Sequence, residues 1–583
     1  MAVQLGQLAQ VALLLLGAGA CTAGSAAMLR LPQDFMLGVG TSAYQTEGAW
    51  NVSGKGVSTL DRAYGGRSDG GGNVATNSYS RYKEDIAMLK LMGVSTNKQA
   101  NKQTGKHLKV SYYRFSIAWA RLLPTGEADN VNPDGVRSYN AVLDELKAAG
   151  IEPLESGLPF ESAPLLSVFN KVTLFHMDFP AVLDDRFGGW ISPLMVDYFE
   201  TYAVTAFKLF GDKVRYWVTL NEPYMLCVYG HGHGRLGATR VEPGITEYLC
   251  GHHMVLAHAR AYRAYKKGFS HQGGQIGLTL EDFHTRPHGA AGGAASPADE
   301  RAAEVHQQFS LGWYLDPLVG RGGRGGEYPE LMRTLVDANS ARENRARSRL
   351  PTFTEEERAL LAGALDFLGL NVYFGWHARH GVPDGAGDPS LERDAGYTIV
   401  GTHDQFLPPG PFRSTPWVLR ASLDWLRRRY GGELPVIITE NGFGDSGAEG
   451  LQDTSRVEYL RAHLSELMQA VLVDRHNVKG YFAWCLLDDF EWGAGYKSKF
   501  GLVHVDFTSG SLKRTPKASL FFYRQFIQQR GLPVDTATVP VPGPAWKSES
   551  QSTAAAPAPD TASRSLVAGL GALPLILALW RRA

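Results

Sequence analysis

The chain has 583 residues, of which 44% are hydrophobic and 11% aromatic, which is enough apolar material for a single barrel or for one to three ordinary domains. Its formal net charge is +0 with a sequence pI near 7.3, so the overall charge gives no case for nucleic-acid binding. Four cysteines in this length exclude a disulfide scaffold.

The first segment, residues 1–27, has the pattern of a secretory signal peptide. An apolar run from Val11 to Ala20 is followed by small residues through Ala27, although the usual lysine or arginine before the run is missing. Cleavage between Ala20 and Ala27 would remove one cysteine. Three cysteines then remain, so at least one thiol is free or pairs with another chain: Cys227, Cys250 and Cys485.

Between residues 31 and 530, strand-like runs alternate with helical patterns such as Ser78–Met92 and Val457–Val473. This alternation predicts an α/β fold, a single (β/α)8 TIM barrel with long loops. A doubly wound open sheet is the alternative, but it predicts a glycine-rich phosphate loop after an early strand, which is absent in that context. The predicted strands are Phe35–Gly40, Tyr112–Ser116, Val172–His176, Tyr216–Leu220, Gln275–Leu280, Phe367–Leu370, Val436–Thr439 and Tyr481–Trp484.

Two short motifs at strand ends carry most of the functional signal. TLNEP places Glu222, and ITENG places Glu440, directly after apolar, β-branched runs typical of buried parallel strands. A glycosidase needs one protonated carboxyl as general acid and a second, ionised carboxyl facing it across the sugar. The simpler interpretation is that both are surface glutamates at strand ends. Their joint motif context favours the catalytic pair.

Most of the other predicted strands also end in a polar or aromatic residue. In a (β/α)8 barrel the reactive groups lie on the face where strands end and loops begin, so these side chains are expected to converge. The residues in question are Gln45, Glu47, Arg114, His176, Asp178, Asn221, Asn371, Tyr373, Asn441 and Trp484.

The C-terminal region predicts a linker and an anchor. Residues 536–565 are rich in Pro, Ala, Ser and Thr and cannot bury enough apolar surface to fold. Residues 566–580 are almost wholly apolar and are followed by Arg581 and Arg582, which favours a single-pass helix with its N-terminus outside. The shortness of the run, interrupted by Pro574, favours a lipid-anchor signal instead. A hydrophobic tail docked on the domain is the third alternative.

The motifs resemble those of glycoside hydrolase family 1, retaining β-glycosidases on a (β/α)8 barrel. The resemblance covers nearly all of the predicted domain, from Phe35 to Phe507. It rests on FMLGVGTSAYQTEGAW, RYKEDIAMLK, YRFSIAWARLLP, TLFHMDFP, TLNEPY, LGWYLDP, DFLGLNVY, ITENG and YFAWCLLDDFEWGAGYKSKFGLVHVDF.

The resemblance implies a role for each site residue. Glu222 is the expected acid/base and Glu440 the nucleophile, with carboxyls about 5–5.5 Å apart. Arg114 and Tyr373 are expected to donate to Glu440 and hold it ionised, and Asn221 to bond the sugar 2-hydroxyl. The remaining sugar contacts are expected from Gln45, His176, Trp484, Glu491 and Trp492.

The chain also departs from the family pattern. The usual tryptophan after His176 is Met177, and the asparagine expected after the fifth strand is Glu281, which predicts a third carboxyl near Glu222 that raises its pKa. Two insertions, at residues 96–110 and 154–171, fall at amino-terminal strand ends, away from the predicted site. They are either real loops or errors in the translated sequence.

The sequence therefore predicts an O-glycosyl hydrolase acting on unphosphorylated β-glucosides or galactosides without a cofactor, in the secretory pathway or at the plasma membrane. Asn51 begins a glycosylation sequon. The HGHG run at His231 resembles a metal tract but lacks acidic or cysteine partners at ligand spacing, so it is interpreted as a loop. The rival hypothesis is a low-activity or non-catalytic, Klotho-like membrane protein that binds carbohydrate or a protein partner.

Overall fold

The computed structural model describes residues 28–94, 111–149, 170–289, 295–320, 323, 325–400 and 414–533, which belong to one compact unit. The predicted signal peptide, linker and anchor lie outside these residues, as do insertion 96–110 and residues 154–169 of the second insertion. No helix within the described ranges is long and apolar enough to cross a membrane.

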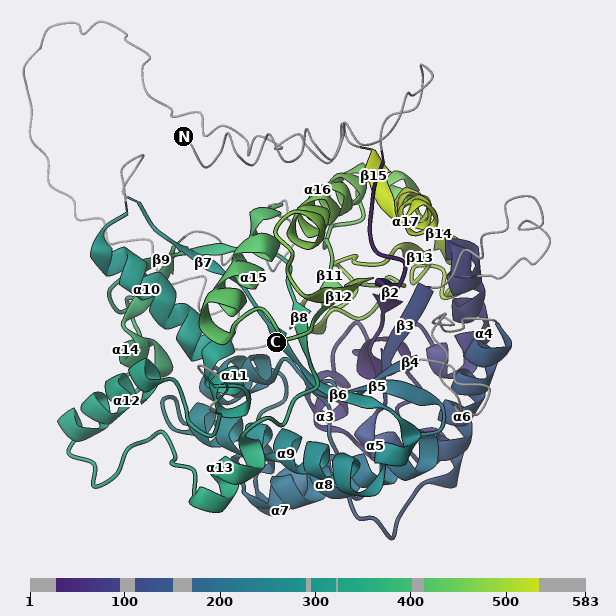
Figure 1. Ribbon diagram of the computed structural model, residues 1–583. Helices are drawn as coiled ribbons and strands as arrows, with labels where there is room; N and C mark the ends of the chain where they lie inside the picture. The colour runs from purple at the N-terminus through teal and green to yellow at the C-terminus, as the bar shows by residue number, and fades with distance from the viewer. Residues whose placement is uncertain are drawn as a thin grey trace, which may run out of the picture. The chain divides into compact units, whose positions relative to one another are not determined.

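Eight parallel strands close into a barrel in the order β11-β12-β2-β3-β4-β5-β6-β8, which confirms the predicted architecture (Figure 1). Each strand coincides with a predicted one to within a few residues. The start of β12 differs most from its prediction, by three residues, and the starts of β4 and β5 differ by two. Lys171, counted in the second insertion, therefore belongs to a barrel strand. The strands are β2 (Met36–Gly40), β3 (Ser111–Ser116), β4 (Asn170–Phe175), β5 (Val214–Asn221), β6 (Gln275–Glu281), β8 (Phe367–Asn371), β11 (Val436–Asn441) and β12 (Val478–Ala483).

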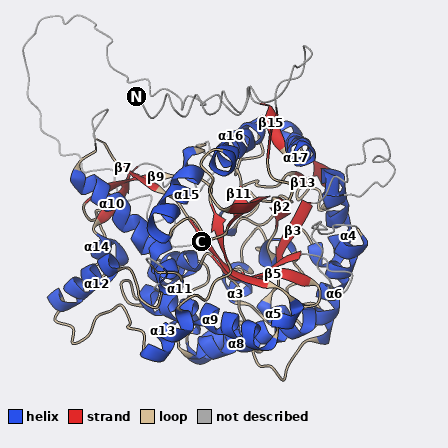
Figure 2. Ribbon diagram, in the orientation of Figure 1, coloured by secondary structure: helices blue, strands red, loops and turns tan. Residues whose placement is uncertain are grey.

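Helices surround the strands on the outside of the barrel (Figures 1 and 2). They begin where local chemistry favours it: α6 starts at Pro133, and the Asn132 side chain accepts from the backbone of Asp134. The two predicted helices are present as α4 and α16. The longer helices are α4 (Ser78–Leu89), α6 (Pro133–Ala148), α8 (Leu194–Phe210), α9 (Thr246–Gly268), α10 (Pro297–Gln307), α12 (Glu330–Arg342), α15 (Trp417–Tyr430), α16 (Thr454–Leu472) and α17 (Ala518–Gln529).

Shorter elements complete the loops between these units. β1 (Met28–Arg30) pairs antiparallel with β15 (Gly531–Pro533) and so ties the two ends of the described chain together. The remaining short elements are α2 (Ala43–Thr46), α3 (Thr59–Tyr64), η1 (Lys90–Val94), α5 (Trp119–Leu122), α7 (Ala181–Phe187), η2 (Gly189–Ile191), η3 (Met225–Gly232), η4 (Ser270–Gln272), β7 (Thr285–Pro287), η5 (Gln308–Gly312), α11 (Trp313–Leu318), α13 (Glu355–Leu361), β9 (Trp376–His380), α14 (Leu391–Ala395), β10 (Tyr397–Val400), η8 (Gly450–Gln452), η9 (Trp492–Ala494), β13 (Val503–Val505) and β14 (Arg514–Pro516).

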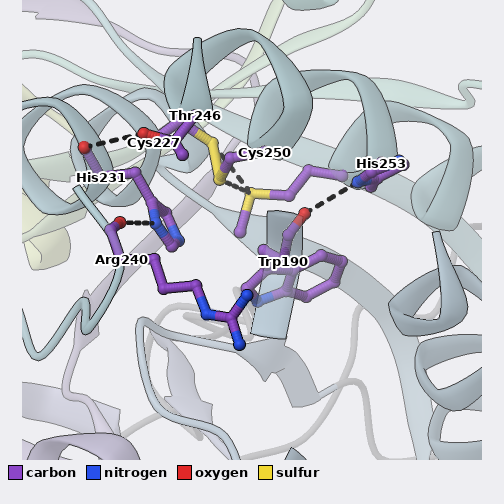
Figure 3. The surroundings of a disulfide bond; sticks show 8 residues. Trp190, Cys227, His231, Arg240, Thr246, Cys250 and His253 are labelled. Atoms are coloured by element: carbon purple, nitrogen blue, oxygen red, sulfur yellow. Dashed lines mark hydrogen bonds between the residues drawn. A yellow bond between two sulfur atoms is a disulfide. The ribbon is translucent and has the colours of Figure 1, made fainter. Parts of the chain in front are cut away.

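A disulfide fixes the segment that follows the TLNEP motif. Cys227, in η3, is bonded to Cys250, in α9, and Figure 3 shows the surroundings of this bond. Cys485 is the free, buried thiol that the odd number of cysteines predicted. The HGHG run was predicted as a loop, but its first two residues belong to η3, and His231 Nδ1 lies 2.9 Å from the Arg240 carbonyl.

Candidate active site

Glu440 lies near the carboxyl end of β11 and is only 3% exposed. Arg114, on β3, donates from Nη1 to its Oε1, and the Tyr373 hydroxyl donates to its Oε2 at 2.6 Å. Both bonds were expected from the sequence. Because the two donors take one oxygen each and include a buried cation, Glu440 is held as a fixed carboxylate.

Glu222 follows the last residue of β5 and turns the chain sharply. Its φ of 49° is in the left-handed region, which costs a non-glycine residue about 1–2 kcal/mol, and its backbone N–H donates to the Thr279 carbonyl at 2.9 Å. Asn371 Nδ2 donates to its Oε1 at 2.7 Å. Burial, followed by the charge of Glu440, raises the pKa of Glu222 to about 8, so it is protonated at neutral pH.

Asn221 links the two glutamates. Its Oδ1 accepts from Arg114 Nη2 at 2.6 Å and from Asn371 Nδ2 at 3.2 Å. Among the described residues its buried Nδ2 has no hydrogen-bond partner. The amide is therefore oriented by its oxygen and has an N–H group left for a ligand.

The other predicted sugar contacts gather at the same end of the barrel. Gln45 donates to Glu491 at 3.1 Å. The buried His176 ring stacks on Trp484 and Trp492, with centroids 5.7 and 6.1 Å apart. Burial and then Arg114 lower the pKa of His176 well below its ordinary value, so the ring is neutral. These five side chains combine polar groups with aromatic rings at this end of the barrel.

Asn371 is the functional residue that the sequence reasoning left without a role. It was placed at a strand end, but nothing in the sequence linked it to Glu222 rather than to the sugar. Its Oδ1 accepts from Thr439 at 2.7 Å, which orients the amide so that Nδ2 points to Glu222 and Asn221. The partners of a side-chain amide depend on the barrel register, which a single sequence does not show.

Two departures from the family pattern, Met177 and Glu281, lie at or just after the carboxyl ends of barrel strands. Met177 is buried with a φ of 73°. Glu281 ends β6, pairs in the ladder with Asn371, and is electrostatically linked to Glu222, as expected. Burial and then the charge of Glu440 raise the pKa of Glu222, whereas burial and then the charge of Glu222 raise the pKa of Glu281, so the expected effect of Glu281 on Glu222 stays a prediction.

The glycine of ITENG is required by packing. A Cβ added to Gly442 would lie 1.9 Å from the Trp484 carbonyl oxygen, which no real side chain tolerates. The close approach brings β11 against the segment that carries Trp484.

Asn51, the predicted glycosylation residue, lies in a turn and is exposed. No group of His, Cys, Asp or Glu suited to a metal ion occurs in the described part of the chain.

Comparison with known proteins places this arrangement in context. A family model described as "Glycosyl hydrolase family 1" matches residues 28–532. The chain is 36% identical over 508 residues to lactase/phlorizin hydrolase of Homo sapiens, which covers 86% of this chain and 24% of that protein, so the chain spans about a quarter of that relative's length.

Two further matches cover their partners almost completely. Beta-glucosidase 42 of Arabidopsis thaliana is 37% identical over 515 residues, with 85% of this chain and 94% of the relative covered. The solved structure of an aphid myrosinase has a TM-score of 0.73 and 34% sequence identity, covering 86% of this chain and 100% of the other. Fold and sequence thus point to the same group of proteins.

Proposed function

The chain belongs to glycosyl hydrolase family 1, a family of O-glycosyl hydrolases, and we propose, from the side chains at the carboxyl ends of its barrel strands, that it is a retaining β-glycosidase. The observation that carries the proposal is the unequal treatment of its two glutamates. Glu440 accepts from a cation and a phenol, whereas Glu222 accepts from a neutral amide and is protonated at neutral pH. In such a pair, the protonated carboxyl is suited to act as the acid and the carboxyl bound to the cation as the nucleophile.

In the first step, an oxygen of Glu440 attacks the anomeric carbon and the bond to the leaving oxygen breaks. Glu222 gives its proton to that oxygen, so the aglycone leaves as a neutral alcohol and a covalent glycosyl-enzyme remains. Arg114 and Tyr373 hold the attacking carboxylate in position. The free N–H group of Asn221 is suited to the 2-hydroxyl, a contact that strengthens in the transition state.

In the second step, Glu222 is the base. It takes a proton from water while the water oxygen attacks the anomeric carbon, and the ester bond to Glu440 breaks with its electron pair returning to the carboxylate. The sugar leaves with its original configuration, and both glutamates regain their starting protonation states.

We propose β-glucosides and β-galactosides as the substrate class, because two of the matched relatives are named beta-glucosidase and lactase/phlorizin hydrolase. Gln45 and Glu491 are suited to ring hydroxyls, and Trp484 and Trp492 to the apolar face of the sugar. A carboxyl at Glu491 would oppose a phosphorylated sugar.

The test is hydrolysis of nitrophenyl β-glucoside and β-galactoside by purified protein, with Glu440→Gln beside it. We expect turnover by the unchanged protein and a loss of at least about a thousandfold in the variant. Glu247→Gln, which changes a buried carboxyl on α9 outside the site, is the matched control and should keep its rate. Equal, negligible rates for the unchanged protein and Glu440→Gln would overturn the proposal.

Two measurements test the mechanism itself. NMR of the first-formed sugar should show the β-anomer, since a double displacement retains configuration. The alkaline limb of kcat/KM should lie near pH 8, because loss of the Glu222 proton removes the acid. First-formed α-anomer would mean an inverting enzyme and would rule out Glu440 as nucleophile.

We further propose that the protein matures in the secretory pathway and is held at a membrane by its C-terminal segment. The Cys227–Cys250 disulfide and the exposed Asn51 sequon support this, because disulfides and N-glycans are both added there. Digestion with an N-glycanase should shift the protein in a gel, and Asn51→Gln should abolish the shift. Release from cells by a phospholipase would identify a lipid anchor, and resistance a membrane-spanning one. An unshifted protein found in the cytosol would contradict this proposal.

A further inference from the structure

Glu281 points into the barrel beside the acid/base glutamate. Side chains two positions apart on a strand share a face. The Thr279 hydroxyl lies 3.4 Å from that of Thr439 across the barrel interior, so Glu281 also points inward. Its neighbour on the next strand is Asn371, whose amide donates to Glu222. The carboxyl of Glu281 therefore lies at the level of Glu222.

This carboxyl is buried without a partner. Glu281 is 3% exposed, and within the described ranges neither of its carboxyl oxygens has a hydrogen-bond partner. An ionised carboxylate in such a place is strongly unfavourable, and the neutral acid is preferred. Burial, followed by the charge of Glu222, raises the pKa of Glu281 well above its ordinary value.

The charged side chains that act on Glu281 are acids, and each opposes its ionisation: Glu222 after β5, Asp282 after β6 and Glu440 on β11. Tyr229 on η3 and Tyr314 on α11 are phenols that keep their protons, and the backbone N–H of Glu281 favours the charged form. Glu222 differs from Glu281 in having an amide donor and Arg114 to favour its charge. Of the two neighbouring carboxyls, Glu222 therefore ionises first.

We propose that Glu281 is a positioning residue for Glu222: it keeps its proton throughout the reaction and donates a hydrogen bond to the carboxylate that Glu222 becomes. The inference rests on the proposed function. Glu222 is ionised only after it has protonated the leaving oxygen, and it must remain so until it takes a proton from water. A neutral acid beside it stabilises that state, and Glu281 itself neither gains nor loses a proton.

Two variants separate the donor from the charge. Glu281→Gln keeps a neutral donor of similar size, whereas Glu281→Met removes the donor. In Glu281→Met the pKa of Glu222 should rise, moving the alkaline limb of kcat/KM up by about one pH unit. With dinitrophenyl β-glucoside, whose leaving group needs no proton, the acid limb of kcat reports the ionisation of Glu222 in the glycosyl-enzyme. This limb should also move up by about one pH unit, whereas kcat/KM at neutral pH should hold.

Glu281→Gln should leave both the alkaline limb of kcat/KM and the acid limb of kcat unchanged. If it instead lowers the alkaline limb by about one unit, Glu281 is ionised in the unchanged protein and the proposal is wrong. The proposal also fails if Glu281→Met moves neither quantity. Glu247→Gln is the matched control: burial raises the pKa of Glu247 to about 7, but it lies on α9, and its change should leave the pH profile unaltered.

A stability measurement tests the neutral state of Glu281 without any turnover. A group whose pKa is raised by folding stabilises fully below its unfolded pKa of about 4.3, and this stability is lost as pH rises through the folded pKa. The urea midpoint of the unchanged protein should therefore fall relative to Glu281→Gln from about pH 5 to pH 9. Parallel curves would overturn the proposal, whereas an inactive but normally folded protein would overturn the proposed function alone.

Discussion

The two ends of the barrel interior treat buried charge in opposite ways. At the carboxyl ends of the strands, charges and polar groups have partners: Arg114 bonds Glu440 and Asn221, and Asn371 bonds Glu222. These bonds join side chains from four strands, β3, β5, β8 and β11. Each group there limits the protonation state or orientation of its neighbour.

At the amino ends the interior is packed with apolar and aromatic residues, and a cation lies among them. Lys171 is fully buried, its Nζ has no hydrogen-bond partner in the part of the chain described, and it lies 4.5 Å from the ring centroid of Phe482. Burial and then Arg114 lower its pKa well below the ordinary value. The packed cluster consists of Met36, Val218, Phe367, Ile437 and Phe482.

The difference shows that burial alone says little about the use of a charged residue. Both ends bury a cation completely, but only Arg114 has an acid to neutralise and a fork of donors to orient. A buried charged group with partners keeps its charge and can orient a reactive group. One without partners destabilises the fold, and its pKa shifts so that the neutral form is preferred. Changing a cation at each end should therefore give effects of opposite sign.

The largest effect is expected from Arg114→Leu. It leaves Glu440 buried beside Tyr373 without a cation, which should cost about 3–5 kcal/mol of unfolding free energy and lower kcat at least a hundredfold. Urea unfolding and nitrophenyl β-glucoside kinetics measure the two effects. Arg114→Lys, which keeps the charge but loses the bond to Asn221, should recover stability better than rate. A Leu variant as stable and active as the parent would mean that the pair has no such role.

At the amino ends of the strands, replacing the buried cation is expected to raise the unfolding free energy instead of lowering it. Lys171→Met replaces an amine without a partner by an apolar side chain of similar length and should raise the unfolding free energy by roughly 3 kcal/mol near neutral pH. Turnover should change far less than in Arg114→Leu, because Lys171 is the ladder partner of Arg114 but its Nζ bonds none of the described groups around Glu222 and Glu440. A destabilised variant would show that Lys171 has a partner in solution.

The pH dependence of this gain follows from the lowered pKa of Lys171. Below about pH 10.4 the unfolded chain binds a proton that the folded protein excludes, so the stability of the parent rises with pH between the folded pKa and that value. The advantage of Lys171→Met should therefore shrink as pH approaches about 10.4. Urea unfolding from pH 6 to 10 measures it, and a constant difference would mean that the lysine is charged in the folded state.

Some features of the barrel can be predicted from the sequence, and others cannot. The strands and the two glutamates are predictable because apolar runs, and the motifs that end them, are local in the sequence. Arg114 and Tyr373 were expected as partners of Glu440 through the resemblance. Asn371 was left without a role because its contacts depend on which strands are neighbours and at what register, which is a property of the closed barrel.

The order in which the two neighbouring carboxyls ionise could not be predicted from the sequence. The sequence places a carboxyl at Glu281 but does not show that it has no hydrogen-bond donor, whereas Glu222 has one; that difference decides which of the two ionises first. Lys171 was counted in an insertion because the predicted strand began one residue later, at Val172. Its place inside the barrel follows from pairing with β3 and β5.

The smallest effect, and the most specific, is expected from Tyr373→Phe. It removes the donor to one oxygen of Glu440 but keeps Arg114 and the packing of the ring. A hydrogen bond to a charged group contributes about 1.5–3 kcal/mol, so kcat should fall at least tenfold, while KM changes little because the phenol bonds the nucleophile rather than the sugar. Steady-state kinetics measure both constants. Tyr523→Phe, which removes a buried hydroxyl donating to the Gly38 carbonyl at 2.8 Å, should cost stability but not rate. If both variants lose kcat equally, the loss comes from general destabilisation of the barrel, and the bond from Tyr373 to Glu440 has no specific role in the reaction.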